Sequence, residues 1–167
     1  VNGTTTTITS TATAIPYDSL SIGVPATGAQ RLNVTTNASN GFVVTVQADG
    51  PLLNSIGDDI DFFADDLGTF TPIPWVAPSA VPADEKTYGH MGVTSSDDHN
   101  GNEFAGNAYA GNFSTTSRAV FSHTGSADGQ TANIGSTTVG YTIQISALQE
   151  AAPDYSNTLT YVATPTF

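Results

Sequence analysis

A two-residue alternation of apolar and polar side chains constrains this chain more than any other feature of its sequence. The alternation is clearest in residues 41–48, 138–146 and 158–163, and it is shorter in residues 30–35 and 118–123. No segment of ten or more residues carries the 3.6-residue period of an amphipathic helix. Because a period of two produces strands with one buried face, we predict an all-β protein. The simplest such fold is an antiparallel β-sandwich, Ig-like or jelly-roll-like.

The length of 167 residues suits one domain with its own core. We expect residues 16–167 to form this domain and residues 1–15 to form an extended N-terminal strand. A turn-rich stretch, NASNG at residues 37–41, predicts a hairpin between the segments on either side of it. The middle of the chain, about residues 50–115, alternates weakly and is rich in Gly, Pro, Asp and Asn. We expect a long irregular insertion there, with short extended pieces at residues 60–63 and 87–93 as candidates.

The composition excludes several classes of protein. Fifteen Asp and Glu against three Lys and Arg give a formal charge of −12, which phosphate backbones repel, so nucleic acid is excluded as a partner. The absence of cysteine excludes disulfides and thiolate chemistry. No apolar run reaches the roughly 18 residues of a membrane span. Threonine is the commonest residue, and a chain rich in Thr, Ser and Asn that begins at Val1 indicates a secreted protein, extracellular or at the cell surface.

The N-terminal segment at residues 4–15, TTTTITSTATAI, has high β-propensity and carries no charge, Gly or Pro. Left unpaired, such a segment is an aggregation hazard, so we expect a pairing partner. Three interpretations remain: the first strand of its own domain, a strand donated to a neighbouring subunit, or a flexible tail. The candidate assembly residues are Thr4, Thr6, Ile8, Ser10, Ala12, Ala14 and Ile15.

Two acidic clusters lie in the middle region, and Lys and Arg are absent from both. The first comprises Asp58, Asp59, Asp61, Asp65 and Asp66, and the second comprises Asp97, Asp98, Asn100, Asn102 and Glu103. Carboxylate and amide oxygens are the ligands of Ca²⁺, and a cation would offset their mutual repulsion. The sequence lacks the complete loop motif of a helix-loop-helix calcium site, so a solvated acidic loop is the competing interpretation.

Catalytic signatures are weak throughout the sequence. The chain has no GxSxG elbow and no HExxH zinc motif, and its three histidines are interpreted as structural. We therefore expect no enzymatic activity. Trp75, in the Pro-rich segment TPIPWVAP, is either a sugar-stacking platform or a side chain that covers the core.

Two segments, residues 31–50 and 139–167, carry a family resemblance. The C-terminal stretch YTIQISALQEAAPDYSNTLTYVATPTF resembles the ends of secreted bacterial β-sandwich modules, including spore-coat-U-like pilus subunits and WxL-type surface domains. The chain departs from both families, because it has no cysteine for the usual disulfide and has Tyr161-Val162-Ala163 in place of Trp-x-Leu. The resemblance implies a surface or fibre protein. Bacterial and archaeal fibre subunits that donate a terminal strand are a further architectural likeness, and residues 4–15 have a suitable length and position.

These observations together predict a structural subunit of an extracellular, pilus-like filament. The chain would polymerise head-to-tail with itself by donating its N-terminal strand, and Ca²⁺ would stabilise the assembly. The alternative function is a calcium-dependent carbohydrate-binding or adhesive surface module that contacts glycans through Trp75.

Overall fold

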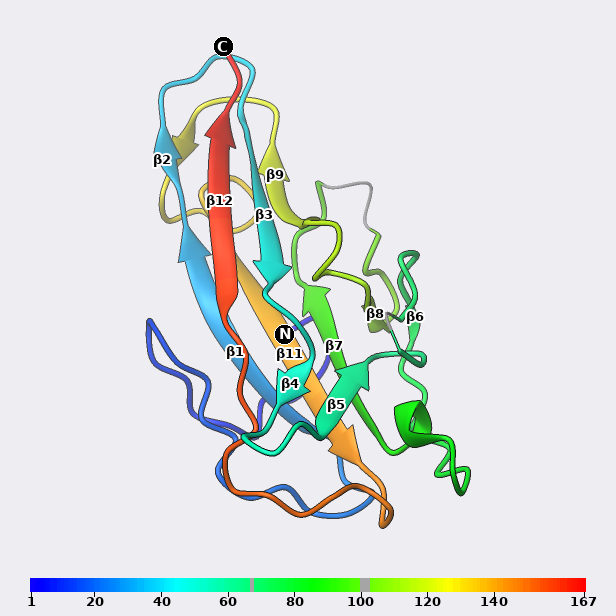
Figure 1. The fold of residues 1–167 in the computed structure, drawn as a ribbon. Helices are drawn as coiled ribbons and strands as arrows, with labels where there is room; N and C mark the ends of the chain where they lie inside the picture. The colour runs from blue at the N-terminus through cyan, green and yellow to red at the C-terminus, as the bar shows by residue number, and fades with distance from the viewer. Residues whose placement is uncertain (67, 100–102) are drawn as a thin grey trace.

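A computed structural model describes residues 1–66, 68–99 and 103–167 of this chain, and it confirms the all-β prediction (Figure 1). The strands in chain order are β1 (Ala26–Asn33), β2 (Thr35–Thr36), β3 (Phe42–Ala48), β4 (Leu52–Leu53), β5 (Asp59–Phe62), β6 (Ile73–Pro74), β7 (Gly89–Ser95), β8 (Ala108–Tyr109), β9 (Arg118–His123), β10 (Ala127–Asp128), β11 (Ser136–Ile145) and β12 (Leu159–Pro165). A short 3₁₀ helix at Glu85–Thr87 precedes β7. Within the described residues, no helix is long and apolar enough to cross a bilayer.

The two main sheets form a curled half-barrel, and a β-sandwich is not confirmed. The larger sheet has the strand order β1-β11-β7-β5-β4, and the smaller has the order β12-β3-β9. The larger sheet is mixed, because β5 runs parallel to β7 while β1, β11 and β7 are antiparallel. On one side the sheets are joined across β7 and β9, where the Ser95 hydroxyl donates a hydrogen bond to the Val120 carbonyl. On the other side the end strands β1 and β12 face each other (Figure 1).

The predicted hairpin between the segments around residues 37–41 does not form. β1 pairs with β11, and β3 pairs with β12 and β9. The turn residues reverse the chain direction, but β1 and β3 then belong to opposite walls of the half-barrel. A local turn signal specifies the reversal and leaves the choice of partner to packing.

The core lies between the walls and follows the predicted alternation where one strand face meets solvent. In β3, Phe42, Val44, Val46 and Ala48 are buried, whereas Val43 and Gln47 are exposed. Tyr141 and Ile143 of β11 fill the same core, together with Phe121 of β9. Phe42 and Phe121 meet edge to face, with ring centroids 4.9 Å apart.

The middle of the chain supplies more regular structure than we expected, and the candidate extended pieces at residues 60–63 and 87–93 correspond to β5 and β7. β7 lies between β11 and β5 in the larger sheet, and every one of its residues is buried. A strand covered on both faces has no reason to alternate, which explains why its sequence, GHMGVTS, carries no clear period-two signal.

Residues 1–25 contain no strand, although we expected an extended strand at residues 4–15. Instead this described segment wraps around the outer edge of β1. It begins on the outer face of the larger sheet, where Asn2 is hydrogen-bonded to Thr94. It then crosses to the inner side of β1, where Tyr17 is hydrogen-bonded to Tyr141.

Candidate assembly site

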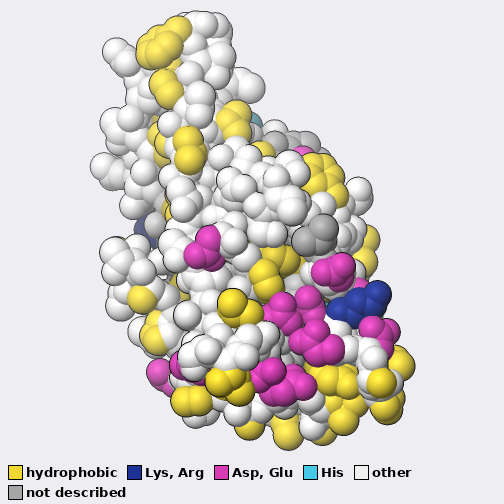
Figure 2. Space-filling model, viewed as in Figure 1, with side chains coloured by type: hydrophobic (Ala, Val, Ile, Leu, Met, Phe, Trp, Pro, Cys, Tyr) yellow, Lys and Arg dark blue, Asp and Glu magenta, His cyan; other side chains and the backbone are white. Residues whose placement is uncertain are grey.

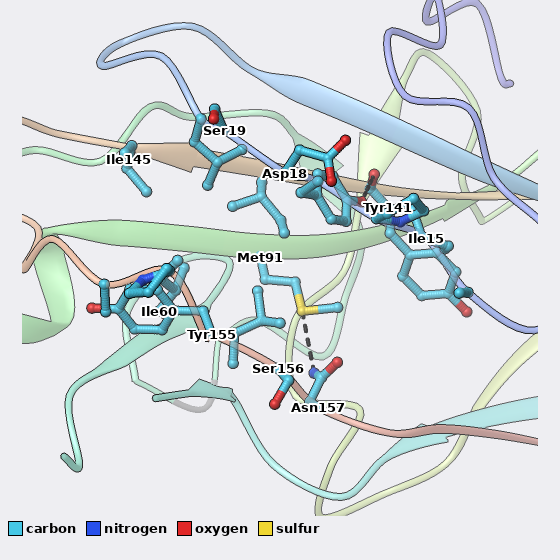
Figure 3. A pocket seen from close by; sticks show the side chains of 18 of the residues that line it. Ile15, Asp18, Ser19, Ile60, Met91, Tyr141, Ile145, Tyr155, Ser156 and Asn157 are labelled. Atoms are coloured by element: carbon cyan, nitrogen blue, oxygen red, sulfur yellow. Dashed lines mark hydrogen bonds between the residues drawn. The ribbon is translucent and has the colours of Figure 1, made fainter. Parts of the chain in front are cut away.

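The candidate site is a groove between β1 and β12, on the open side of the half-barrel (Figure 3). It encloses about 1280 Å³ and reaches the hydrophobic core. Its floor consists of Ile60, Met91, Tyr141 and Ile143, all buried core residues. One rim is formed by residues 12–20, Ile22 and Gln30 of β1, and the other by residues 145–147, 149–153 and 155–159 together with Tyr161 of β12. A closed barrel would have another strand in this position, because only closure removes the edges of a curled sheet.

Both walls of the groove end in a strand whose outer edge is not paired with another strand. β1 and β12 are the terminal members of their sheets. In an antiparallel ladder, alternate residues direct their N–H and C=O groups to opposite edges. The Thr27 carbonyl accepts bonds from outside the sheet, so Thr27, Ala29 and Arg31 present their main-chain groups outward.

Two tyrosines bridge the walls of the groove. The hydroxyls of Tyr141, on β11, and Tyr161, on β12, lie 2.6 Å apart. The Tyr161 hydroxyl also lies 3.4 Å from Oε1 of Gln30, on β1. Burial raises the pKa of Tyr161 to about 12 and raises the pKa of Tyr141 well above its usual value. Both hydroxyls therefore keep their protons at neutral pH, and this hydrogen-bonded pair fixes the separation of the walls.

The first residues of the chain are fastened to the outer face of the larger sheet. The Asn2 side-chain amide donates hydrogen bonds to the Thr94 hydroxyl at 2.8 Å and to the Phe104 carbonyl at 2.5 Å. The hydroxyls of Thr4 and Tyr109 lie 2.8 Å apart. Gly140 leaves room for Val1, because a Cβ at Gly140 would overlap the Val1 side chain.

The following residues cover the outer edge of β1 irregularly. The N–H groups of Thr7 and Ile8 both donate to the Thr27 carbonyl, at 2.8 and 3.1 Å. Side-chain hydroxyls complete the contact: the Thr27 N–H donates to Thr7 Oγ1, and the Ala29 N–H donates to Ser10 Oγ. This cover uses side-chain acceptors where a strand would use carbonyl oxygens, so it is not a regular ladder.

The chain then turns inward and covers part of the groove. A turn is closed by the Thr11 N–H, which donates to the Ala14 carbonyl at 2.8 Å. Ile15, Tyr17 and Leu20 are partly buried against the core. The Tyr17 hydroxyl donates to the Tyr141 carbonyl at 2.6 Å, and burial raises the pKa of Tyr17.

The predicted assembly residues divide according to this path. Thr4, Ile8, Ser10 and Ile15 are half-buried against the chain itself, whereas Thr6, Ala12 and Ala14 are exposed. Sequence reasoning missed Gly28, which accommodates Ile15 on the inner side of β1. It also missed Tyr17 and Leu20. Their apolar side chains follow Ile15 closely in the sequence and are the signal that could have indicated them.

The first acidic cluster is brought together only in part. Carboxylate oxygens of Asp59, Asp61 and Glu85 lie within 4.8 Å of one another, and the sequence did not predict Glu85 as a member. Asp61 is 7% exposed, and desolvation with the neighbouring carboxylates raises its pKa to about 7. Desolvation and Asp59 likewise raise the pKa of Glu85 to about 7. Acidic side chains gather on the face shown in Figure 2.

The remaining acids of that cluster have other contacts. Asp58 accepts a hydrogen bond from the Asn54 side chain at 2.9 Å, within a turn where Asn54 also caps three backbone N–H groups. Asp65 lies 3.4 Å from His90 Nε2. Asp66 is exposed.

The second acidic cluster separates in the fold. Carboxylates of Asp97 and Asp98 lie within 4.8 Å of a His99 ring nitrogen, and buried Asp97 also accepts the Ser122 N–H at 3.0 Å. Asn100 and Asn102 lie outside the described residues. Glu103 pairs with buried Arg118, whose guanidinium lies over the Phe70 ring at 4.6 Å. Glu103 therefore stabilises a buried cation.

Trp75 packs on the outer face of the larger sheet. Its ring stacks on Phe63 at a centroid distance of 4.7 Å and an angle of 10°, and its Nε1 donates to Gln144 at 2.7 Å. Tyr109 meets it edge-on at 5.1 Å. One face of the indole and its only hydrogen-bond donor are thus engaged within the protein.

The fold and the groove describe an all-β half-barrel with two terminal strands and an opening between them. No protein-family model matches the chain, and searches of curated proteins and of solved structures find no match either. The function of the chain therefore has to follow from the groove and the residues that line it.

Proposed function

We propose that this protein is a structural subunit of an extracellular filament whose subunits exchange their N-terminal segments. The observation that carries the proposal is the groove of about 1280 Å³ between the terminal strands β1 and β12. A strand from a second copy would extend the larger sheet at β1 and cover Met91, Tyr141 and Ile143 on the floor. Because donor and acceptor are different surfaces, the contact is head-to-tail and propagates.

The irregular cover of β1 supplies a driving force for exchange. Within one chain, residues 7–10 reach the edge of β1 through two main-chain bonds to Thr27 and two bonds to side-chain hydroxyls. A regular strand from another copy would pair along most of β1, and each added main-chain bond contributes about 1 kcal/mol net. The ladder bonds between chains replace the few bonds that each chain breaks when its own segment is released, so the cost of exchange is small.

Residues 16–25 provide the linker that exchange requires. They carry no strand and connect the wrapped segment to β1. Extended, ten residues span about 33 Å, enough to reach a neighbouring subunit. Releasing this linker also withdraws Tyr17 and Leu20 from the groove and opens it for the incoming strand.

We propose that Ca²⁺ supports the assembly at Asp59, Asp61 and Glu85. Stacking subunits that each carry a formal charge of −12 is electrostatically unfavourable. Three carboxylates within 4.8 Å supply the hard oxygen ligands that Ca²⁺ prefers, and a bound cation would remove their mutual repulsion. Excess chelator should then loosen preformed filaments.

Negative-stain electron microscopy tests the proposal directly. The full chain, incubated with calcium, should form filaments, and the variant lacking residues 1–15 should stay monomeric by size-exclusion chromatography. Val81→Ser, a change at an exposed apolar side chain that does not line the groove, is the matched control and should assemble like the unmodified chain. A monomeric full chain under all these conditions would overturn the proposed function.

A further inference from the structure

Gly28 forms a seat for one particular side chain. A Cβ at Gly28 would overlap the Cγ2 of Ile15 and lie 3.4 Å from Ser10 Oγ and 3.5 Å from Tyr17 Oη. Gly28 is opposite Tyr141 in the β1–β11 register, so the seat faces the core side of the sheet. Because Gly28 has no side chain, the Ile15 side chain occupies the space above it. Any larger residue at position 28 would displace Ile15.

We propose that the Ile15–Gly28 contact sets the register of assembly: it forms within one chain in the monomer and between two chains in the filament. This inference rests on the proposed function. In an exchange of identical segments, the contact that fits in the monomer is the contact that fits between subunits. The occupant is therefore the N-terminal segment of a second copy, with its Ile15 over the acceptor's Gly28.

The composition of residues 4–15 explains why one anchored position is needed. Ten of these twelve residues are Thr, Ser or Ala, and the other two are Ile8 and Ile15. A uniform Thr-rich strand slips easily, because shifts by two residues present nearly identical faces. In a regular strand Ile8 and Ile15, seven positions apart, point to opposite faces, so only Ile15 enters the groove when it faces the core.

Because of the Ile15–Gly28 contact, we expect the monomer to resist assembly until its N-terminal segment is released from the groove. Ile15, Tyr17 and Leu20 cover the core, and the Tyr17 hydroxyl is bonded to the Tyr141 carbonyl. An incoming strand must displace these side chains first. Assembly should therefore begin with a lag, and the lag should shorten when the covering segment is held less tightly in the monomer.

A cysteine pair tests the inference cleanly, because the chain has no cysteine of its own. A Cβ at position 28 would overlap the Cγ2 of Ile15, which is one bond from the Ile15 Cβ, so the two Cβ atoms fall within the roughly 4 Å that a disulfide bridges. When I15C/G28C is oxidised as a monomer, a disulfide should form within the chain and the protein should no longer form filaments. Reduction of the disulfide should restore filament formation. The same variant, assembled under reduction and then oxidised, should give a covalent ladder on a non-reducing gel.

Controls separate the possible failures. I15S/G28S, which cannot cross-link, should assemble regardless of oxidation. A12C/I15S/G28C shortens residue 15, so residue 28 is accommodated as in I15C/G28C; because its residue 12 is exposed, it should give at least tenfold less ladder. Filaments whose cross-links stay within single chains, or that form from the oxidised monomer, would overturn the register inference while leaving the filament intact. Absence of filaments from the unmodified chain would overturn the proposed function and this inference with it.

A size-compensation experiment gives a second, independent readout. Gly28→Val introduces a residue that is suited to a strand but occupies the space of the Ile15 side chain. The critical concentration for assembly should therefore rise at least tenfold. Adding Ile15→Ala should return it to within about threefold of the original. A Gly28→Val variant that assembles normally would contradict the inference.

Discussion

Replacing buried Asp61 with asparagine should stabilise the calcium-free protein at high pH and have little effect at low pH. Asp61 is 7% exposed, and desolvation together with Asp59 and Asp66 raises its pKa from 3.8 to about 7. At low pH the carboxyl is protonated in both the folded and the unfolded chain and contributes no pH dependence. Between about pH 4 and pH 7 the unfolded chain has lost this proton while the folded chain keeps it, so rising pH favours unfolding.

The magnitude follows from the size of the shift. A shift of about three pKa units corresponds to about 4 kcal/mol if fully expressed. Exposed neighbours and solvent access at the rim of the cluster screen the repulsion, so we expect about 1–2 kcal/mol. Asp61→Asn should therefore raise the free energy of unfolding by that amount at pH 8 and by less than about 0.5 kcal/mol at pH 4.

Urea unfolding in excess chelator, followed by tryptophan fluorescence at both pH values, measures the difference. Asp66→Asn removes one charge from an exposed neighbour and is the matched control, expected to change stability by about 0.5 kcal/mol or less. Calcium should stabilise the unmodified chain more than Asp61→Asn. An equal effect of Asp61→Asn at pH 4 and pH 8 would refute the electrostatic reasoning, and an equal response to calcium would refute the metal assignment.

Three further changes test other parts of the structure. Phe121→Ala, in the core against Phe42, should lower the free energy of unfolding by about 3–5 kcal/mol in chemical denaturation; a decrease below about 1 kcal/mol would contradict its burial. Glu103→Gln leaves the Arg118 guanidinium without its anionic partner and should cost about 2–3 kcal/mol by the same method, whereas Asp98→Asn should cost little. Tyr161→Phe leaves the buried Tyr141 hydroxyl without its bond across the groove and should cost about 1–2 kcal/mol; an unchanged melting temperature would argue against the bridge.

Alternation predicted the strands that have one face toward water. The predicted segments at residues 41–48, 118–123, 138–146 and 158–163 correspond to β3, β9, β11 and β12. Their apolar positions form about half of the buried core because side chains on one face of a strand share one environment. The β7 region showed only a weak signal, a candidate extended piece at residues 87–93, because both faces of β7 are buried.

The composition of the candidate sites depended more strongly on long-range contacts than the positions of the strands did. Asp59 and Asp61 were visible as neighbours in a run of acids, but Glu85 joins them through the 3₁₀ helix that precedes β7. Glu103 belonged to an acidic run and yet pairs with Arg118, fifteen residues away. Clustering along the chain is therefore a poor guide to which carboxylates share a site.

The sequence by itself determined the all-β class. It also determined which face points inward in the strands that have one face toward solvent, since both properties follow from the side-chain period and local propensity. Only the tertiary structure decided which strands pair, how the sheets curl, and that a groove remains between β1 and β12. It also decided that residues 1–15 wrap the edge of β1 and place Ile15 on Gly28. Pairing, closure and seating depend on contacts between segments far apart in the chain, and main-chain hydrogen bonds look the same whichever segment supplies them.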